Sequence, residues 1–345
     1  MPASGLLANA CRSIFSLTSV PHKNKGGQLL RLFGRRSGRP SAAALGLVLS
    51  PQAFALAQVS PDNAAPRLLH LQQVDFANLG EFAARLDQLC DALSLHGHAL
   101  VVCLSPELYR LHQADAPNVP LAERNAALAW TLRDVLDFPA TEAALDSFAP
   151  PAVVNRSGVE RLFVAVSHKA RIKPWVEAIL AAGFLVRAID IPELCSRNLL
   201  LRLSPELNSA AVLVPSSRSC ALYLFHGNEL AVSRQLSGIG DLRNLFTGLD
   251  NRQPQEQLLL EIQRTLDYYE SQIARRPVAR LLLPPLPEEL SGLLPLLRDN
   301  LGVTVATLDL PTLVPMDGSS DQKTLAAGWL AVGAALRQEV SDAAS

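Results

Sequence analysis

The hydrophobic positions of this chain fall into short runs separated by turn residues. Runs at about 43–49, 54–59 and 67–72 have the length and spacing of β-strands. The first two lie in "GLVLSPQAFALAQV", residues 46–59, where a Ser-Pro-Gln turn joins two apolar segments. This stretch predicts a β-hairpin that opens a domain.

A helical period follows at residues 76–97. Its apolar side chains recur every three or four residues and predict an amphipathic helix that Gly97 ends; they are Leu79, Phe82, Leu86, Leu89 and Leu93. "HALVVCL", residues 98–104, has the length and β-branched content of a buried strand. Prolines then interrupt residues 105–158, which carry one helical segment at 120–136 and therefore predict an inserted subdomain.

Regular alternation of strand and helix resumes after this insertion. "RLFVAVS", residues 161–167, predicts a strand, 172–183 a helix that Gly183 ends, and 184–191 another strand. A strand–helix–strand unit of this length predicts a parallel strand pair joined by a right-handed crossover.

The same plan begins again near Ser209. Strands are expected at 210–214, 221–225 and 229–236, with "HGN" as the turn before the third, and a long amphipathic helix at 254–274. The remaining expected elements are a strand at 279–284, a helix at 288–299, a strand at 303–310 and a last helix at 323–338. The sequence therefore predicts a duplicated α/β domain plan.

These patterns divide the chain into four parts. The expected parts are a basic tail at 1–40, a first domain at 41–205 with its insertion at about 105–158, a second domain at 206–320, and a C-terminal helix at 321–340 that returns to the first domain.

Composition narrows the functional classes. Hydrophobic residues make up 49% of the 345 positions, and the formal net charge of −1 argues against a globally basic nucleic-acid-binding protein. No apolar run reaches the roughly 18 residues of a membrane-spanning helix. The five cysteines are scattered without metal-ligand spacing, which favours reduced thiols in a cytosol-like compartment. His96 and His98 flank Gly97; an ordinary loop pair is preferred over a metal site because no thiol or carboxylate clusters with them in the sequence.

The N-terminal tail is strongly basic. Residues 1–61 contain no acidic residue, and their basic residues are Arg12, Lys23, Lys25, Arg31, Arg35, Arg36 and Arg39. "LLRLFGRR", within residues 29–39, has the composition of a short basic amphipathic contact with anionic lipid. The prediction for residues 1–40 is nevertheless a disordered tail, or a start codon placed too far upstream; the lipid contact and an organellar transit peptide are the alternatives.

Several segments together resemble one protein family. "LEIQRTLDYYESQ", residues 260–272, is similar to the Glu-Ile-x-Arg-Ser-Leu-x-Tyr helix of PilM, the cytoplasmic actin-like protein of type IV pilus assembly. Residues 182–200 and 328–337 resemble two further PilM segments, and residues 120–148 are closer to the MshI branch, which serves MSHA-type pili. The resemblance extends from about residue 29 to residue 337 and implies the actin-like ATPase (ribonuclease H-like) fold: two duplicated α/β domains with an inserted subdomain.

The resemblance also identifies the positions that would handle a nucleotide. An actin-like pocket uses two acids for Mg²⁺ and attacking water, and glycines that bring backbone N–H groups to phosphate. Here the acid positions fall on Val48 and Leu213, the first-loop glycine on Ser50 and its basic residue on Ala55. The remaining glycine positions carry Pro215, Pro284 and Pro285, which have no N–H to offer. We therefore expect no ATPase activity, no metal site and no required cofactor.

The resemblance also gives a set of candidate residues for a vestigial nucleotide pocket. Its candidate residues are Gly46, Ser50, Ser216, Ser217, Glu261 and Arg264, with Arg218 beside the serines. The alternative for Glu261 and Arg264 is an exposed ion pair one helical turn apart, and for the Ser-Ser-Arg segment a solvated hairpin turn. Asp190 and Asp241 are the acids that an active ATPase could use instead.

The function implied by the resemblance is that of a scaffold. In this family the protein grips a short N-terminal cytoplasmic peptide of a bitopic PilN-like membrane protein and so connects the membrane ring to the assembly motor. We expect the groove between residues 79–104 and the 105–158 insertion. The alternatives are an active ATPase and the related cytoplasmic domain of a type II secretion protein, although no membrane helix follows here.

Overall fold

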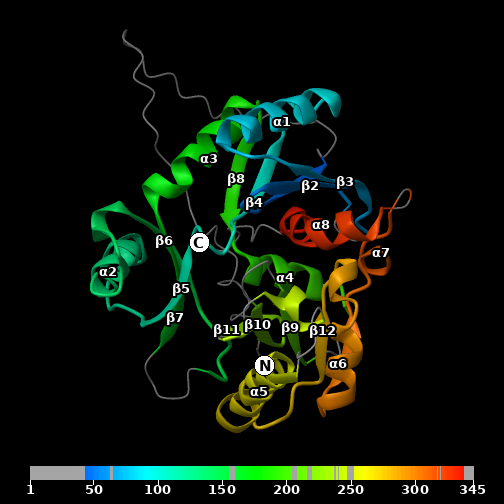
Figure 1. Cartoon of the computed structure of the whole chain (residues 1–345). Coiled ribbons are helices and arrows are strands. Elements are labelled where there is room, and N and C mark those ends of the chain that lie inside the picture. Colours follow the sequence, from blue (N-terminus) through cyan, green and yellow to red (C-terminus); the bar gives the residue numbers. More distant parts are fainter. Residues whose placement is uncertain are drawn as a thin grey trace, which may run out of the picture.

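The computed structural model describes residues 43–62, 65–154, 160–203, 208–215, 220–236, 238–239, 241–246, 252–316, 318 and 320–337. Within these residues the chain forms two five-stranded sheets and one three-stranded sheet (Figure 1). The basic tail, including residues 29–39, lies outside the described residues, as do Ser216, Ser217 and Arg218.

The first sheet has the strand order β3-β2-β1-β4-β8. Its strands are β1 (Ala44–Leu49), β2 (Ala53–Val59), β3 (Leu68–Asp75), β4 (Ala99–Cys103) and β8 (Leu185–Asp190). β1 and β2 pair antiparallel, with Leu47 opposite Leu56, which confirms the predicted opening hairpin. Helices α1 (Leu79–Ala92) and α3 (Lys169–Ala181) pack on one face, over the odd-numbered residues of β1.

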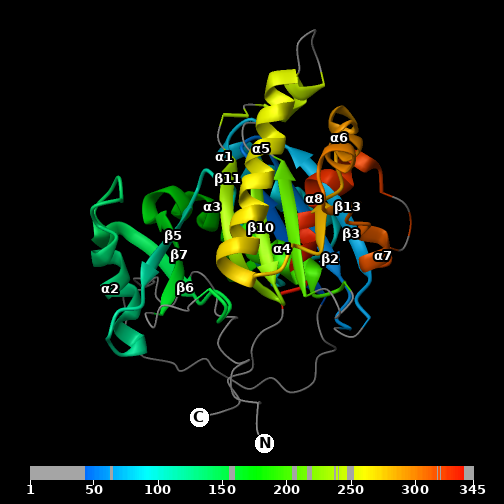
Figure 2. The same cartoon turned by 90° about the horizontal axis from the view of Figure 1, so that it is seen from below.

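The second sheet repeats this plan in the order β11-β10-β9-β12-β13. Its strands are β9 (Ser209–Pro215), β10 (Cys220–His226), β11 (Glu229–Leu236), β12 (Arg280–Leu283) and β13 (Thr304–Thr307). The outer face is covered by α5 (Arg252–Tyr268), which continues as the π-helix η4 (Tyr269–Ala274), by α6 (Leu293–Asn300) and by the 3-10 turns η3 (Leu242–Leu245) and η5 (Glu288–Leu290). Figure 2 shows α5 lying along this sheet.

The inner faces of both sheets meet one shared core. This core contains residues of β1, β2, β9 and β10 together with α4 (Pro192–Leu200), α7 (Leu310–Leu313) and α8 (Gln322–Ala335). α4 and α8 therefore lie between the two sheets (Figure 1), and the apolar sequence of α8, which has no polar face, follows from contact on several sides.

The third sheet belongs to the insertion and has the order β5-β7-β6. Its elements are β5 (Arg110–Asp115), η1 (Leu121–Glu123), α2 (Arg124–Thr131), η2 (Ala140–Glu142), β6 (Ala143–Phe148) and β7 (Arg161–His168). The strands β5 and β6 were not predicted, because their sequences lack the apolar alternation of a half-buried strand. The expected helix at 120–136 shortens to α2, which a 3-10 turn precedes.

The predicted parallel pair of strands 161–167 and 184–191 is wrong. β7 is the central strand of the insertion and pairs antiparallel with β5 and β6, whereas β8 pairs in parallel with β4 in the first sheet. The insertion therefore extends through His168, and α3 brings the chain back to the first sheet. An apolar run identifies a buried strand but does not identify its partner.

None of the helices in the described part of the chain is both long and apolar enough to cross a membrane. The four cysteines in that part are free and buried; they are Cys90, Cys103, Cys195 and Cys220. His96 contacts Asp91 at 2.5 Å, and no cluster of three or more metal-ligating side chains occurs among the residues described.

Candidate functional site: the cavity between the two sheets and the inserted subdomain

Val48 and Leu213, which stand at the two positions where an actin-like pocket has its acids, lie in the hydrophobic core. Val48 packs with Ala55 and Val101 in the core shared by the two sheets, and Leu213 packs beneath α5 on the outer face of the second sheet. Leu213 is fully buried and Val48 is 6% exposed. An uncompensated carboxylate at either position would be taken out of water, which is strongly unfavourable.

Gly46 serves a packing role in the structure. A Cβ atom on Gly46 would lie 2.0 Å from the carbonyl oxygen of Ala331 and 2.6 Å from the backbone nitrogen of Ala335, both in α8. Gly333 brings the other side of α8 equally close to α4, where a Cβ would lie 2.3 Å from the Cys195 carbonyl oxygen. Gly46 therefore allows α8 to contact β1 directly.

Ser50 lies in the exposed turn of the opening hairpin. Its backbone N–H donates to the carbonyl oxygen of Ala53 at 2.9 Å, which closes the turn. Ser50 thus has the role of a turn residue in the described structure, and its side chain faces solvent.

A cavity of about 320 Å³ lies between the two sheets. Its second-domain wall includes Pro215, Pro284 and Pro285, so the structure brings together three of the positions that the resemblance assigned to nucleotide contact. The opposite wall is formed by Gln73 of β3 and by α8 residues Lys323, Ala326, Ala327 and Trp329. The expected vestigial residues Gly46, Ser50, Glu261 and Arg264 are not among its lining residues.

Two acids line this cavity, Asp241 and Glu289, and Asp241 is paired with an arginine. Asp241 accepts from Arg243 through both carboxylate oxygens, at 3.0 Å from Nε and 2.5 Å from Nη2. Hydrogen bonds from the Arg243 side chain hold the pKa of Asp241 below its usual value. Asp190, the other candidate acid, is fully buried and contacts Arg337 at 2.5 Å, away from the cavity lining. The carboxylates of Asp241 and Asp190 are thus each paired with an arginine instead of being open for Mg²⁺.

The ion pair between Glu261 and Arg264 is confirmed, but the expectation that it is exposed is wrong for Glu261. Arg264 contacts Glu261 at 3.0 Å, and a second arginine, Arg234 of β11, contacts the other carboxylate oxygen at 3.0 Å. Glu261 is only 6% exposed because α5 packs against the sheet at this point. Sequence reasoning missed Arg234 because its partner lies 27 residues away on another element.

A third buried carboxylate, that of Glu193, joins three parts of the fold. Glu193 of α4 accepts from the Tyr109 hydroxyl at 2.6 Å and from the Ser233 hydroxyl at 2.9 Å. Tyr109 precedes β5 of the insertion, and Ser233 belongs to β11 of the second sheet. Burial raises the pKa of Glu193, while these two hydrogen bonds oppose the shift. Glu193 therefore connects the segment between β4 and β5, which leads into the insertion, to the second sheet.

Replacing Glu193 by glutamine is expected to change how stability depends on pH. Because the pKa of folded Glu193 is raised, its contribution to stability is full below the unfolded-state pKa and is lost as pH rises through the folded-state pKa. Glutamine keeps hydrogen-bonding capacity toward both hydroxyls without a charge. In urea titrations, Glu193→Gln should gain stability relative to wild type as pH rises from about 4 to about 7.

The matched control is Glu177→Gln, because Glu177 is exposed and pairs only with exposed Lys173 at 3.7 Å. Its stability difference from wild type should stay nearly constant over the same range. A constant difference for Glu193→Gln as well would contradict the assignment of a buried, hard-to-ionise carboxyl.

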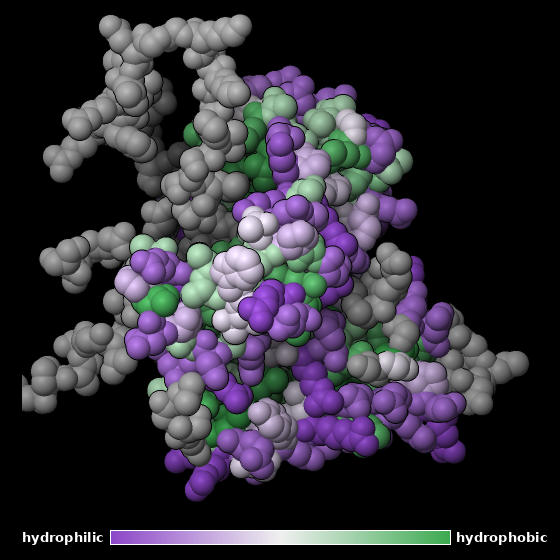
Figure 3. Space-filling view, turned by 90° about the vertical axis from the view of Figure 1, so that its left-hand side faces the viewer, coloured by the Kyte–Doolittle hydropathy of each residue, from purple (hydrophilic) through white to green (hydrophobic). Residues whose placement is uncertain are grey.

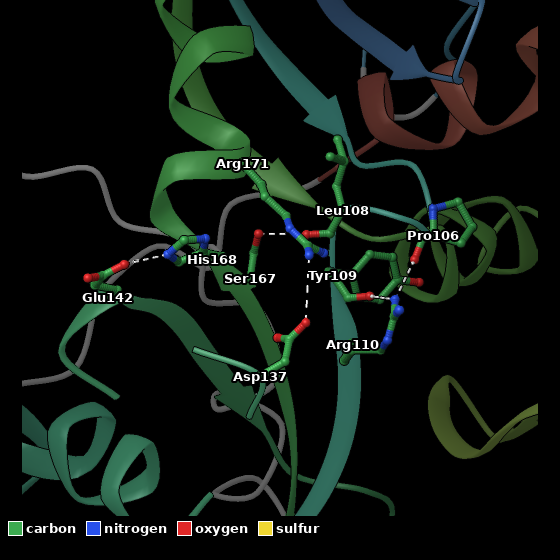
Figure 4. Close-up of polar contacts among 9 residues, drawn as sticks. All are labelled: Pro106, Leu108, Tyr109, Arg110, Asp137, Glu142, Ser167, His168 and Arg171. Atoms are coloured by element: carbon green, nitrogen blue, oxygen red, sulfur yellow. Dashed lines mark hydrogen bonds and ion pairs between the residues drawn. The ribbon is translucent and has the colours of Figure 1, made fainter. Parts of the chain in front are cut away.

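The insertion is attached to the first domain at the start of α3 (Figure 4). His168 contacts Glu142 at 2.5 Å, and Arg171 contacts Asp137 at 3.6 Å. The Ser167 hydroxyl donates to the Leu108 carbonyl oxygen at 2.6 Å and so ties β7 to the link between β4 and β5. These contacts place the start of α3 and the β4–β5 link beside the insertion. Helix α1, which belongs to the expected groove, packs against α3.

The insertion also carries three large apolar side chains that are exposed to solvent. Val135 is 62% exposed and Trp130 57%, and Leu121 is exposed as well. Figure 3 views the molecule from this side and shows apolar side chains near the centre, with hydrophilic ones around them. Trp130 of α2 is therefore exposed, whereas Leu128 of the same helix is buried. Exposed apolar residues are typical of a protein contact where they form one continuous patch.

Comparison with known proteins is informative at the level of structure. No protein-family model matches the sequence, and no curated protein matches it. A chain of a PilM–PilN type IV pilus biogenesis complex is similar over 86% of this chain and 99% of its own length, with 24% identity and a TM-score of 0.68. The cytoplasmic domain of EpsL, an inner-membrane component of the type II secretion system of Vibrio cholerae, covers 84% of this chain and 94% of its own length, at 13% identity and a TM-score of 0.47. An ethanolamine utilization protein, EutJ from Carboxydothermus hydrogenoformans, covers 87% and 91%, at 9% identity and a TM-score of 0.44.

In this chain, both five-stranded sheets repeat one order, in which hairpin strands are followed by parallel strands. The chain has the actin-like ATPase fold, in the form seen in the PilM–PilN type IV pilus biogenesis complex.

Proposed function

We propose that this protein is a PilM-like scaffold of a pilus assembly platform that binds a membrane partner and does not hydrolyse ATP. The observation that carries the proposal is the structural similarity to a chain of the PilM–PilN complex over nearly all of that chain. The proposed partner is a PilN-like bitopic membrane protein, bound through its short N-terminal cytoplasmic peptide. The proposed location is the cytoplasmic face of the inner membrane, in an MSHA-type system, where the scaffold connects the membrane ring to the assembly motor.

The proposal that ATP is not hydrolysed is supported by the residues at the expected pocket. Apolar Val48 and Leu213 occupy the acid positions, and both are buried. Pro215, Pro284 and Pro285 line the cavity and offer no N–H to phosphate. Of the two acids that line the cavity, Asp241 is held by Arg243, and the other is Glu289. A scaffold that binds a peptide needs none of these groups, which fits their replacement.

The proposal that the insertion contributes to peptide binding is supported by its exposed apolar residues. An extended peptide can pair its backbone with a sheet edge and place alternate side chains against apolar surface. The insertion offers both, since β5 and β6 are the outer strands of its sheet and Trp130 and Val135 are exposed nearby in sequence. We place the peptide along the insertion, beside the start of α3.

The test is a binding titration between the full chain and a labelled synthetic peptide with the sequence of the PilN-like protein's cytoplasmic N-terminus. The fluorescence anisotropy of the peptide reports binding. Trp130→Ala combined with Val135→Ser should weaken binding at least about tenfold, because exposed aromatic and aliphatic contacts dominate such interfaces. Leu180→Ser is the matched control, since Leu180 is also exposed but lies in α3 near its C-terminal end. Absence of binding by the wild-type chain would overturn the proposed function, and equal affinity of all variants would overturn the assigned surface.

A further inference from the structure

Three arginines without a partner lie in one exposed turn of the second domain. Most arginines that the structure describes have a hydrogen-bond or ion-pair partner. The four that have none are Arg124, Arg275, Arg276 and Arg280, and the last three lie close together in sequence. The turn that holds them, residues 275–280, connects η4 to β12. Arginine side chains on a protein surface are commonly paired with carboxylates, so this concentration of free guanidinium groups requires an explanation.

The turn is held in a defined conformation. Arg275 adopts a left-handed backbone with φ of 55°, which ends the π-helix, and Pro277 restricts the next residues. Val278 is buried in the outer core of the second domain, and the Ala279 N–H donates to the Ser209 hydroxyl at 3.0 Å. The backbone is thus anchored while the three guanidinium groups face solvent.

Further cationic groups lie along the same rim of the second sheet. Arg280 is opposite Ala210 in the sheet register, and Ser209 is opposite His226, so this rim runs from β12 to the turn between β10 and β11. Arg197 of α4 reaches that turn and donates to the Asn228 carbonyl oxygen at 2.5 Å. The described acidic residues in the segments that carry this rim are Glu229, Asp267 and Glu270. Positive charge therefore exceeds negative charge along the described rim.

An exposed aromatic ring accompanies these arginines. Tyr268, in the last turn of α5, is 51% exposed and precedes Arg275 by seven residues, with the π-helix η4 between them. Tyrosine and arginine together are typical of surfaces that meet the headgroup region of a bilayer, where the ring lies at the interface and the cation contacts phosphate.

We propose that the rim formed by Tyr268, Arg275, Arg276 and Arg280, the "arginine rim", docks the folded protein on an anionic lipid surface. The three guanidinium groups project from a turn, and a broad anionic plane can meet all of them without a shaped pocket. Lipid is favoured over nucleic acid because the chain as a whole carries a net charge of −1, whereas a nucleic-acid-binding domain is usually basic overall. This contact is separate from the one expected for residues 29–39.

The test is flotation of the full chain with phosphatidylcholine vesicles that contain or lack phosphatidylglycerol. The wild-type chain should bind only the anionic vesicles, and high salt should release it. The triple variant Arg275→Glu, Arg276→Glu, Arg280→Glu should lower the partition coefficient at least about tenfold, since each basic residue near the surface contributes to binding. The matched control, Arg85→Glu, Arg133→Glu, Arg252→Glu, changes the net charge equally at exposed arginines elsewhere and should lower it much less.

A third variant, Arg31→Glu, Arg35→Glu, Arg36→Glu, separates the contribution of the tail. The proposal would be overturned if the arginine-rim variant bound anionic vesicles as well as the wild-type chain does. It would also be overturned if the matched control lost as much binding as the arginine-rim variant. Circular dichroism verifies that each variant is folded, and Arg275→Gln, Arg276→Gln, Arg280→Gln replaces the triple variant if charge reversal prevents folding. Peptide titration of the same variants is independent of vesicle binding, so failure of the proposed scaffold function would be recognised separately.

Discussion

Replacing Gly46 by alanine is expected to lower the free energy of unfolding by more than about 3 kcal/mol, beyond the usual range for a single added methyl group. The added Cβ would lie 2.0 Å from the Ala331 carbonyl oxygen, so β1 and α8 would have to separate. A backbone atom cannot rotate away as a side chain can. Because α8 lies in the core shared by both sheets, the displacement would loosen packing in both domains. Urea denaturation followed by circular dichroism measures the effect.

Gly302→Ala is the matched control for this substitution. A Cβ on Gly302 would meet no heavy atom within 4 Å, and the residue is exposed, so we expect a change within about 0.5 kcal/mol. If Gly46→Ala fails to accumulate as folded protein while Gly302→Ala is normal, the expectation is met in its extreme form. A Gly46→Ala protein within about 1 kcal/mol of wild type would contradict the described contact of α8 with β1.

Replacing Arg337 by methionine is expected to cost about 3–5 kcal/mol, the range seen when one member of a buried ion pair is removed. Arg337 contacts Asp190 at 2.5 Å, and both side chains are almost completely buried. Methionine fills much of the volume but leaves the Asp190 carboxylate with the Ile191 N–H as its remaining described hydrogen-bond donor. The measurement is the free energy of unfolding from urea titration at neutral pH.

A second substitution shows whether buried charge is the cause. Adding Asp190→Asn to Arg337→Met removes the unpaired charge and keeps an oxygen that accepts from Ile191, so the double variant should recover at least half of the lost stability. A double variant as unstable as the sum of its two single variants would show that lost packing, and not an unpaired carboxylate, explains the effect.

The duplicated plan of the fold could be predicted because each half repeats the same periodicities. The two hairpins, the amphipathic helices α1 and α5 and the apolar strands β4 and β12 all have local patterns that identify their type. The pairing of β7 could not be predicted, because its sequence suits a buried strand in either sheet. β5 and β6 were missed because partners within the insertion, and not local alternation, make them strands.

The candidate site shows a similar division. The prolines at 215, 284 and 285 were found by their place in the resemblance, and the structure groups them around one cavity. The role of Gly46 could not be predicted, since it depends on α8, almost 300 residues further along the chain. The contacts of Glu193 with Tyr109 and Ser233 likewise join residues that are distant in sequence, and a single sequence contains no local signal for them.

A calorimetric titration of the full chain with Mg-ATP tests whether this protein works without nucleotide. We expect no heat of binding on a sample whose folding is verified by its urea transition, because the acid positions are buried apolar residues and the cavity wall offers prolines to phosphate. Binding in the micromolar range, accompanied by release of phosphate, would contradict the claim that this protein acts as a scaffold without nucleotide chemistry.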